Sequence, residues 1–233
     1  MNIKIHYQTL IGYLVFLLTL ISASDLFGQD FLWLHYFNKY KLSYKFSIDS
    51  DFGWRQYGNP EEYRGQFRTG LHYDLSDVSY VRGGIMYVNG TVAAEEIRYY
   101  QDFVYKFRIG DVTVQQRVRF EEQTFTDPER DFRFRLRYNP AVKFPSPIGQ
   151  FTLSAEPFFT LTDPNSRVSS NRLLVGLTNK VYKNISLSIQ YINERSYTKA
   201  ETNFIDEAQM IRIKIDHVIH PLKTGPLFGR NKM

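Results

Sequence analysis

The chain has 233 residues, of which 43% are hydrophobic and 16% are aromatic, with 17 Tyr and 19 Phe. The absence of cysteine excludes a disulfide scaffold and a thiolate metal site. The formal charge of +5 would suit nucleic acid. The arginines, however, are spread at strand spacing and the lysines form no block, so we expect no nucleic-acid partner.

Residues 1–28 have the features of a secretory signal peptide. Lys4 gives a positive start, residues 10–21 form a mostly apolar segment, and small residues follow in Ser22-Ala23-Ser24. We expect cleavage after Ser24 or after Gly28. The alternative is an uncleaved membrane anchor, but the apolar segment is shorter than the roughly 20 residues that a spanning helix needs.

The next segment, residues 30–41, is rich in aromatic residues and has more than one interpretation. It contains Phe31-Leu32-Trp33-Leu34-His35-Tyr36-Phe37 and then Lys39-Tyr40-Lys41. It is a strand at the seam of a barrel, a periplasmic entry segment, or half of a missed pair of strands. The third interpretation would make the total number of strands twelve, because bacterial single-chain barrels usually have even strand numbers.

Ten long runs then alternate apolar and polar residues with a period of two, which is typical of β-strands. They span residues 43–57, 62–75, 78–90, 95–109, 111–124, 131–144, 149–162, 170–182, 184–197 and 204–218. Each is far longer than the usual globular strand of about 5–6 residues. Each also exceeds the roughly 9–11 residues that a tilted membrane strand needs.

This pattern predicts an all-β protein, an antiparallel transmembrane β-barrel of about ten strands, with twelve as the alternative. The barrel domain would span residues 29–220, followed by an irregular tail over 221–233. Short connections at 76–77, 110–111, 145–148 and 183–184 alternate with longer ones, as short periplasmic turns alternate with longer external loops. With ten strands, the barrel would begin and end on the periplasmic side.

One face of these strands is rich in charge. In residues 132–138, four apolar side chains alternate with three arginines. Because an arginine facing lipid at the bilayer midplane costs about 2–4 kcal/mol, we expect the charged faces to point into the barrel. The predicted interior charge network contains Arg98, Asp102, Arg117, Arg119, Glu121, Arg133, Arg135, Arg137, Glu156 and Arg172.

The charged interior has two interpretations. In the first, salt bridges hold a narrow barrel closed, since a barrel of this size can be filled by side chains. In the second, unpaired cations form an anion-conducting pore or a pocket for an anionic ligand such as a lipid phosphate or carboxylate. The first interpretation is favoured.

Catalysis would require a nucleophile and a base, and His72 is the best candidate for the base. Asp74 follows on the same face of the strand, and Ser154 is a possible nucleophile. The sequence contains no G-x-S-x-G or H-E-x-x-H motif and no metal-ligand spacing, so we predict no cofactor and no metal. The alternative function is an outer-membrane lipid-modifying hydrolase, resembling a phospholipase or lipid A deacylase, with a site at the barrel rim.

The order of several short motifs resembles a known family. The motifs are the arginine-rich strand of Arg133, Arg135, Arg137 and Tyr138, the Glu-Pro-Phe-Phe of residues 156–159, and Asn171-Arg172-Leu173. Together they resemble the outer-membrane barrels of Gram-negative bacteria grouped as domain-of-unknown-function family 2490. The resemblance implies a barrel surrounded by outer-membrane lipid, but no activity or site.

From these observations we predict an integral outer-membrane barrel that is structural or forms a narrow or closed channel. Glu156 should pair with an arginine of the 131–144 run, because adjacent antiparallel strands bring residues of one face within reach.

Overall fold

The alternation of apolar and polar residues corresponds to eleven long β-strands. The structure, a computed structural model, describes residues 31–92, 95–128, 132–162, 168–197 and 204–220, without the side chains of 204–206. The strands are β1 (Phe31–Lys41), β2 (Phe46–Tyr57), β3 (Tyr63–Asp74), β4 (Ser79–Gly90), β5 (Glu96–Ile109), β6 (Val112–Phe125), β7 (Arg133–Ser146), β8 (Gly149–Thr160), β9 (Val168–Tyr182), β10 (Ile185–Tyr197) and β11 (Phe204–Ile219).

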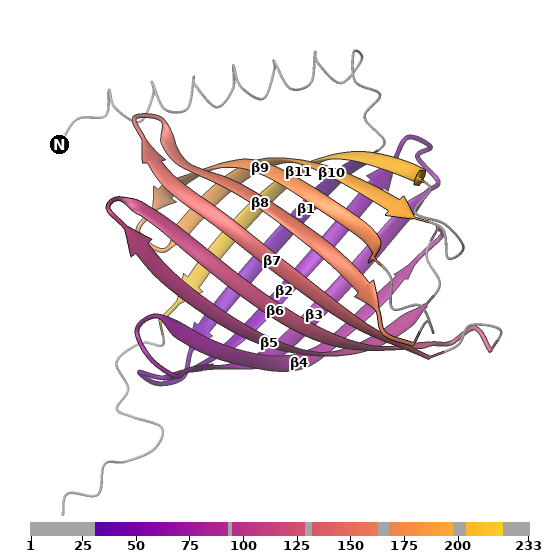
Figure 1. The fold of residues 1–233 in the computed structure, drawn as a ribbon, viewed down its shortest axis with the longest axis horizontal. Coiled ribbons are helices and arrows are strands. Elements are labelled where there is room, and N and C mark those ends of the chain that lie inside the picture. The colour runs from indigo at the N-terminus through magenta and orange to yellow at the C-terminus, as the bar shows by residue number, and fades with distance from the viewer. Residues whose placement is uncertain (1–30, 93–94, 129–131, 163–167, 198–203, 221–233) are drawn as a thin grey trace, which may run out of the picture.

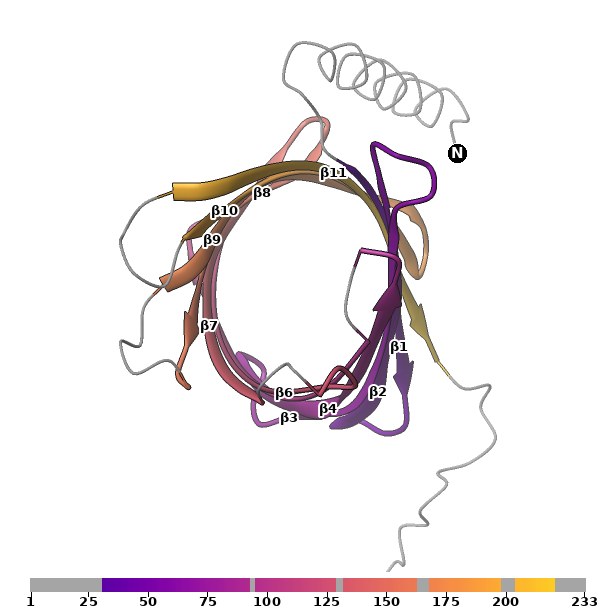
Figure 2. The same cartoon turned by 90° about the vertical axis from the view of Figure 1, so that its right-hand side faces the viewer.

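The strands form one closed barrel in which each strand pairs antiparallel with the next along the chain (Figure 1). The barrel closes where β1 pairs with β11, from Phe31 opposite Met210 to Tyr40 opposite Ile219, and this pair is parallel. In an up-and-down chain of odd strand number, the first and last strands necessarily run in the same direction. Figure 2 shows the strands from one end, surrounding a single interior.

The structure confirms the ten alternating runs as strands, with bounds that differ by three residues or fewer. The total is eleven, one more than the expected count of about ten and one fewer than the alternative of twelve. Residues 31–41 are a complete strand at the seam, and they have no missed partner among the described residues. An even number is needed only if the closing pair is antiparallel, and here parallel hydrogen bonds close the barrel instead.

The connections divide the barrel into two ends. Each odd-numbered strand from β1 to β9 leads into a short turn. We call the end of the barrel that carries these turns the turn end. The even-numbered strands lead into the longer connections at the opposite, loop end. In the turn after β5, Gly110 has a φ of 58°, a left-handed conformation that glycine adopts without steric cost.

The expectation that the barrel begins and ends on the same side is also wrong. Because β1 is a strand, the barrel begins at the loop end, and β11 leaves it at the turn end. The predicted signal peptide over 1–28 and the predicted tail over 221–233 lie outside the described residues.

The two faces of the wall have opposite polarity, as β5 illustrates. Asp102 on one face is only 3% exposed, whereas Phe103 on the other face is 47% exposed. The same alternation continues from Glu96 to Tyr105, and the buried face carries Glu96 and Arg98 together with Tyr100 and Val104. A soluble sheet has the reverse arrangement, since its apolar face packs in the core.

Four of the buried apolar residues pack together in a small cluster. It contains Phe31 and Trp33 of β1, Met210 of β11 and Ile192 of β10, and therefore lies beside the seam. Most of the buried face elsewhere is polar or charged. No helix in the described part of the chain is long and apolar enough to cross a membrane.

Candidate functional site

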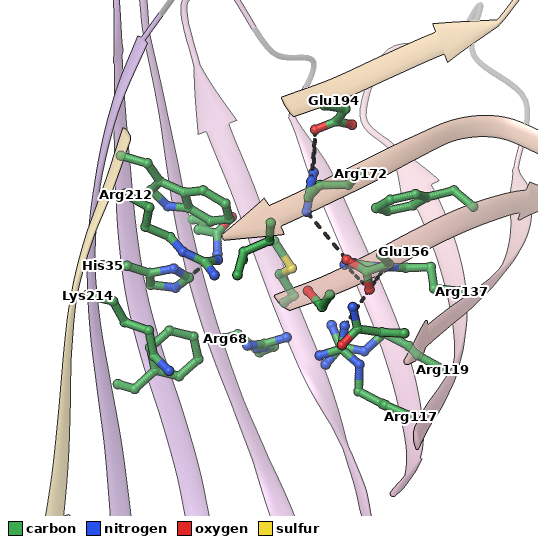
Figure 3. Close-up of a pocket in the computed structure, with 18 of the residues that line it drawn as sticks. His35, Arg68, Arg117, Arg119, Arg137, Glu156, Arg172, Glu194, Arg212 and Lys214 are labelled. Atoms are coloured by element: carbon green, nitrogen blue, oxygen red, sulfur yellow. Dashed lines mark hydrogen bonds and ion pairs between the residues drawn. The ribbon is translucent and has the colours of Figure 1, made fainter. Parts of the chain in front are cut away.

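The barrel encloses a cavity of about 280 Å³ whose lining is dominated by cations (Figure 3). Strands from all around the barrel contribute to it, because their inward faces converge there. Its basic residues are Arg55, Arg64, Arg68, Arg82, Arg98, Arg117, Arg119, Arg135, Arg137, Arg172, Arg212 and Lys214. Glu156 and Glu194 are the carboxylates in the lining. The other buried carboxylates lie in the wall among these cations.

Asp102 is the first of three buried carboxylates that each bind several arginines. It lies between Arg82 on β4 and Arg119 on β6, which are its neighbours in the strand register. Arg82 Nη2 donates to Asp102 Oδ2 at 2.6 Å, and Arg119 Nε donates to Oδ1 at 2.6 Å. Register alone brings these three charges together, since residues directly opposite on adjacent strands lie within side-chain reach.

Glu121 on β6 is fully buried and binds arginines from both neighbouring strands. From β7, Arg135 Nη2 donates to Oε2 at 2.5 Å and Arg137 Nη1 donates to Oε1 at 2.9 Å. From β5, Arg98 Nη1 donates to Oε2 at 3.4 Å. Several guanidiniums thus surround one carboxylate.

Glu156 on β8 continues the network toward β10. Arg137 Nη2 donates to Glu156 Oε1 at 2.8 Å, which is the pairing expected between the 131–144 run and its neighbour. Arg117 on β6 also binds Oε1, and Arg172 Nη1 lies 3.7 Å from Oε2. Arg172 in turn donates to Glu194 at 2.5 Å. The ion pairs therefore extend without interruption from β6 to β10.

Of the ten residues that the sequence predicts for this network, only Arg133 lies apart from it. Arg133 is exposed at the start of β7, and its guanidinium lies over the ring of Phe125 at 5.5 Å. Its position at the strand end explains the difference, because the interior carboxylates lie farther along the strands. The structure brings the other nine residues into linked ion pairs.

A second ion-pair cluster was not predicted from the sequence. Asp51 on β2 is buried between His35 Nε2 at 2.9 Å and Arg68 Nε at 2.6 Å. His35 belongs to β1, which the sequence left without a definite assignment. A signal was nonetheless present, because Ser47, Asp49, Asp51 and Arg55 are polar residues at the even spacing of one strand face.

His72 is not arranged as a catalytic base. Its Nδ1 lies 3.0 Å from Asp49 Oδ2, and its Nε2 lies 2.9 Å from Asp74 Oδ1. With a carboxylate at each ring nitrogen, neither nitrogen is left to accept a proton from a serine hydroxyl. Ser154 lines the cavity, but His72 does not. The geometry therefore favours a structural role for the pairing of His72 with Asp74.

A third group of charges surrounds Trp33. Arg55 on β2 and Arg212 on β11 are its two neighbours in the strand register. Their guanidinium carbons lie 3.9 Å and 4.6 Å from the centroid of the indole, and that of Arg172 lies at 6.0 Å. Arg64 on β3 lies directly opposite Arg55. This group differs from the first two because none of the residues directly opposite Arg55, Arg64 or Arg212 on the neighbouring strands is a carboxylate.

The described residues contain no group of three or more His, Asp or Glu side chains arranged to hold a metal ion. The basic cavity would also repel a cation. The chemistry that the interior offers is the binding of anions through hydrogen bonds from guanidinium groups.

Comparison with known protein families gives a match. The model of a family described as a protein of unknown function (DUF2490) matches residues 31–204, which include ten complete strands and the first residue of β11. No curated protein and no solved structure matches the chain.

Proposed function

The chain belongs to the DUF2490 family, and from its fold and interior we propose that it is an integral β-barrel of a bacterial outer membrane. In this proposal its interior is held closed by ion pairs, and its role is structural rather than that of an open pore.

One observation carries this proposal, namely the apolar outer surface of a closed barrel. The exposed large apolar residues include Leu34, Phe52, Phe67, Leu71, Ile85, Tyr99, Phe103, Phe120, Leu153, Leu173 and Val175, which come from eight different strands. Patches of this kind on soluble proteins are small, and larger ones mark contact with a partner or a membrane. A barrel without free edges also satisfies its backbone hydrogen bonds internally, as hydrocarbon surroundings require.

Aromatic residues near both ends support a membrane position. Phe46 and Tyr73 pack together near the turn end with ring centroids 4.6 Å apart. Trp54 and Tyr63 stack at the loop end at 4.5 Å. Membrane barrels have aromatic girdles at both lipid–water interfaces, where an apolar ring can keep its polar atom in contact with water.

The ion pairs favour a closed interior. Arginine side chains from β6, β7 and β9 meet on Glu156, and their arms occupy space that an open pore would leave to water. The cavity among these side chains has a volume of about 280 Å³. Porins that leave an aqueous channel have about 16–18 strands.

Membrane extraction and single-channel recording test the two parts of the proposal. The full chain should stay in isolated outer membranes after a carbonate wash that releases peripheral proteins. In planar bilayers the purified protein should give no long-lived conductance steps, while a porin control should. Release by carbonate would exclude the integral barrel, and stable steps would exclude the closed interior.

A further inference from the structure

Three arginines near the loop end differ from the rest of the interior. Arg64, Arg55 and Arg212 lie on β3, β2 and β11, in a row across the barrel wall with Trp33 of β1 between the second and third. Within the described ranges, none of these three arginines has a carboxylate within 4.0 Å, whereas Arg68, Arg82 and Arg119 each have one. Glu194, which lines the same cavity, is engaged by Nε and Nη2 of Arg172.

Stacking on Trp33 explains how two of these cations are held. Arg55 and Arg212 lie over the indole, and a guanidinium that stacks uses only its flat face. The N–H groups point outward in the plane of the guanidinium and remain available. Arg212 Nε donates to Gln190 Oε1 at 2.6 Å. This hydrogen bond fixes the Arg212 side chain and leaves its two terminal nitrogens for a ligand.

Two buried donors in the row lack an acceptor. The Nε atoms of Arg55 and Arg64 are buried and have no hydrogen-bond partner among the described residues. Burying a charged donor without an acceptor is costly, and native proteins usually satisfy such groups. Arg55 and Arg64 are also directly opposite on adjacent strands, where like charges destabilise the pair. An anion bound by the guanidiniums of both would offset the repulsion between their charges.

The cavity gives such an anion a place to bind. Trp33, Arg55, Arg64 and Arg212 all belong to its lining. Trp33 is the third residue of β1 and Arg55 is the third from the end of β2, so the row lies close to the loop end. A volume of about 280 Å³ is near the lower limit for ligand pockets, which suits a small solute.

We propose that Arg55, Arg64 and Arg212, with Trp33 as their stacking platform, form a binding site for a small multivalent oxyanion, of which phosphate is the simplest. Three guanidiniums without carboxylates balance a dianion better than a monoanion, and their N–H edges match phosphate oxygens in pairs. The phosphate is either free or part of a lipid headgroup. The proposed site requires only that the barrel is folded. It therefore does not depend on the membrane location proposed above.

Trp33 is a built-in reporter for this site. The chain has two tryptophans, and Trp54 lies on the other face of the wall, stacked on Tyr63. In a Trp54→Phe background, phosphate added to the detergent-folded full chain should change the Trp33 emission and saturate. Chloride at equal ionic strength should not, because screening alone does not saturate in this way. The midpoint of urea unfolding should also rise with phosphate.

Substitutions then locate the binding. Arg55→Gln and Arg212→Gln should each weaken phosphate binding about tenfold or more, since each removes charge-assisted hydrogen bonds. Arg55→Lys keeps the charge but loses the planar fork, and should give an intermediate loss. The matched control is Arg108→Gln, an exposed arginine near the turn end, which should bind like the parent.

The outcomes separate the two sources and the competing explanations. Saturation by inorganic phosphate assigns the site to a free anion. If only detergent micelles that carry phosphatidic acid give saturation, and Arg55→Gln abolishes it, the site binds a lipid headgroup. The proposal is overturned if no probe saturates, or if the glutamine variants, shown to be folded by their urea unfolding transitions, bind like the Arg108 control. Failure of the carbonate test with saturable phosphate binding would overturn only the membrane location.

Discussion

Glu121 shows what holds the interior together at the scale of single residues. It is fully buried and accepts hydrogen bonds from Arg98, Arg135 and Arg137. The attraction in such a site is largely offset by the loss of hydration of all the charges. Removing one partner is therefore costly, because the remaining charges stay buried without compensation.

We expect Glu121→Gln to lower the free energy of unfolding by about 3–5 kcal/mol, since the amide keeps the shape but leaves several guanidiniums without a counter-charge. Urea titration of the protein folded into lipid vesicles would measure the change. The matched control is Glu122→Gln, one residue along and on the opposite face of β6, which should change stability little. Equal losses in the two variants would show that the buried network contributes nothing specific.

The outer face permits a second test at the residue scale. Phe103 is at the middle of β5 and Ile109 is its last residue, and both are exposed. In a membrane, Phe103→Arg should cost about 2–4 kcal/mol and Ile109→Arg about 0–1 kcal/mol, because the penalty falls from the midplane to the interface. Refolding yields and urea unfolding in vesicles would compare them. If the two variants cost the same, the outer face is not in hydrocarbon.

At the scale of elements, the seam between β1 and β11 is the unusual feature. Every other neighbouring pair is antiparallel and joined by a turn or loop, whereas this pair is parallel and joins opposite ends of the barrel domain. Parallel pairing is slightly weaker per residue. The apolar cluster around Phe31, Trp33 and Met210 lies at this seam and strengthens it by burial.

Engineered cysteines test the register of the seam. Leu34 is opposite Ile213, and both belong to the outer face. We expect Leu34→Cys with Ile213→Cys to form a disulfide on mild oxidation, because opposite residues lie within disulfide range. Non-reducing gels would show it without interference, since the chain has no cysteine.

The control pair is Leu34→Cys with Ile215→Cys, which is on the same face but two residues farther along. The offset adds roughly 6.6 Å, which is too far for a bond without movement of the backbone. Equal cross-linking in the two pairs would mean that the seam slides or that the register is wrong.

At the scale of the whole molecule, most of the wall was predictable from the sequence. The ten runs became strands because alternation at period two, repeated over long segments, has no competing helical interpretation. The ion pairs from β6 to β10 were predictable for a related reason. Glu156 and Arg137 are on consecutive strands, so their proximity follows from local hairpin geometry.

The seam and the sites beside it were not predictable. The contact of Trp33 with Arg212 joins residues far apart in the sequence, and its register depends on how the whole barrel closes. The preference for even strand numbers also argued against counting residues 31–41 as a strand. The second cluster, His35 with Asp51, was missed because His35 is on that strand.

The orientation of the barrel gives a prediction at this same scale. The turn at Tyr44 and the connection at Asn59 lie at opposite ends of the barrel, because β2 separates them. Short epitope tags inserted there should label differently on intact cells, with one accessible to antibody and the other accessible only after the outer membrane is opened. Labelling of both on intact cells would contradict a barrel that spans the membrane.

The odd number of strands has a consequence for how such a protein is made. If the barrel spans a membrane as proposed, its eleven strands bring the chain in from one compartment and out into the other. Any machinery that inserted such a barrel would then have to deliver one end of the barrel domain across the bilayer, not only the loops between strands. In that case a partner attached before Phe31 and one attached after Ile219 would face different compartments, and the barrel would connect the two in a fixed direction.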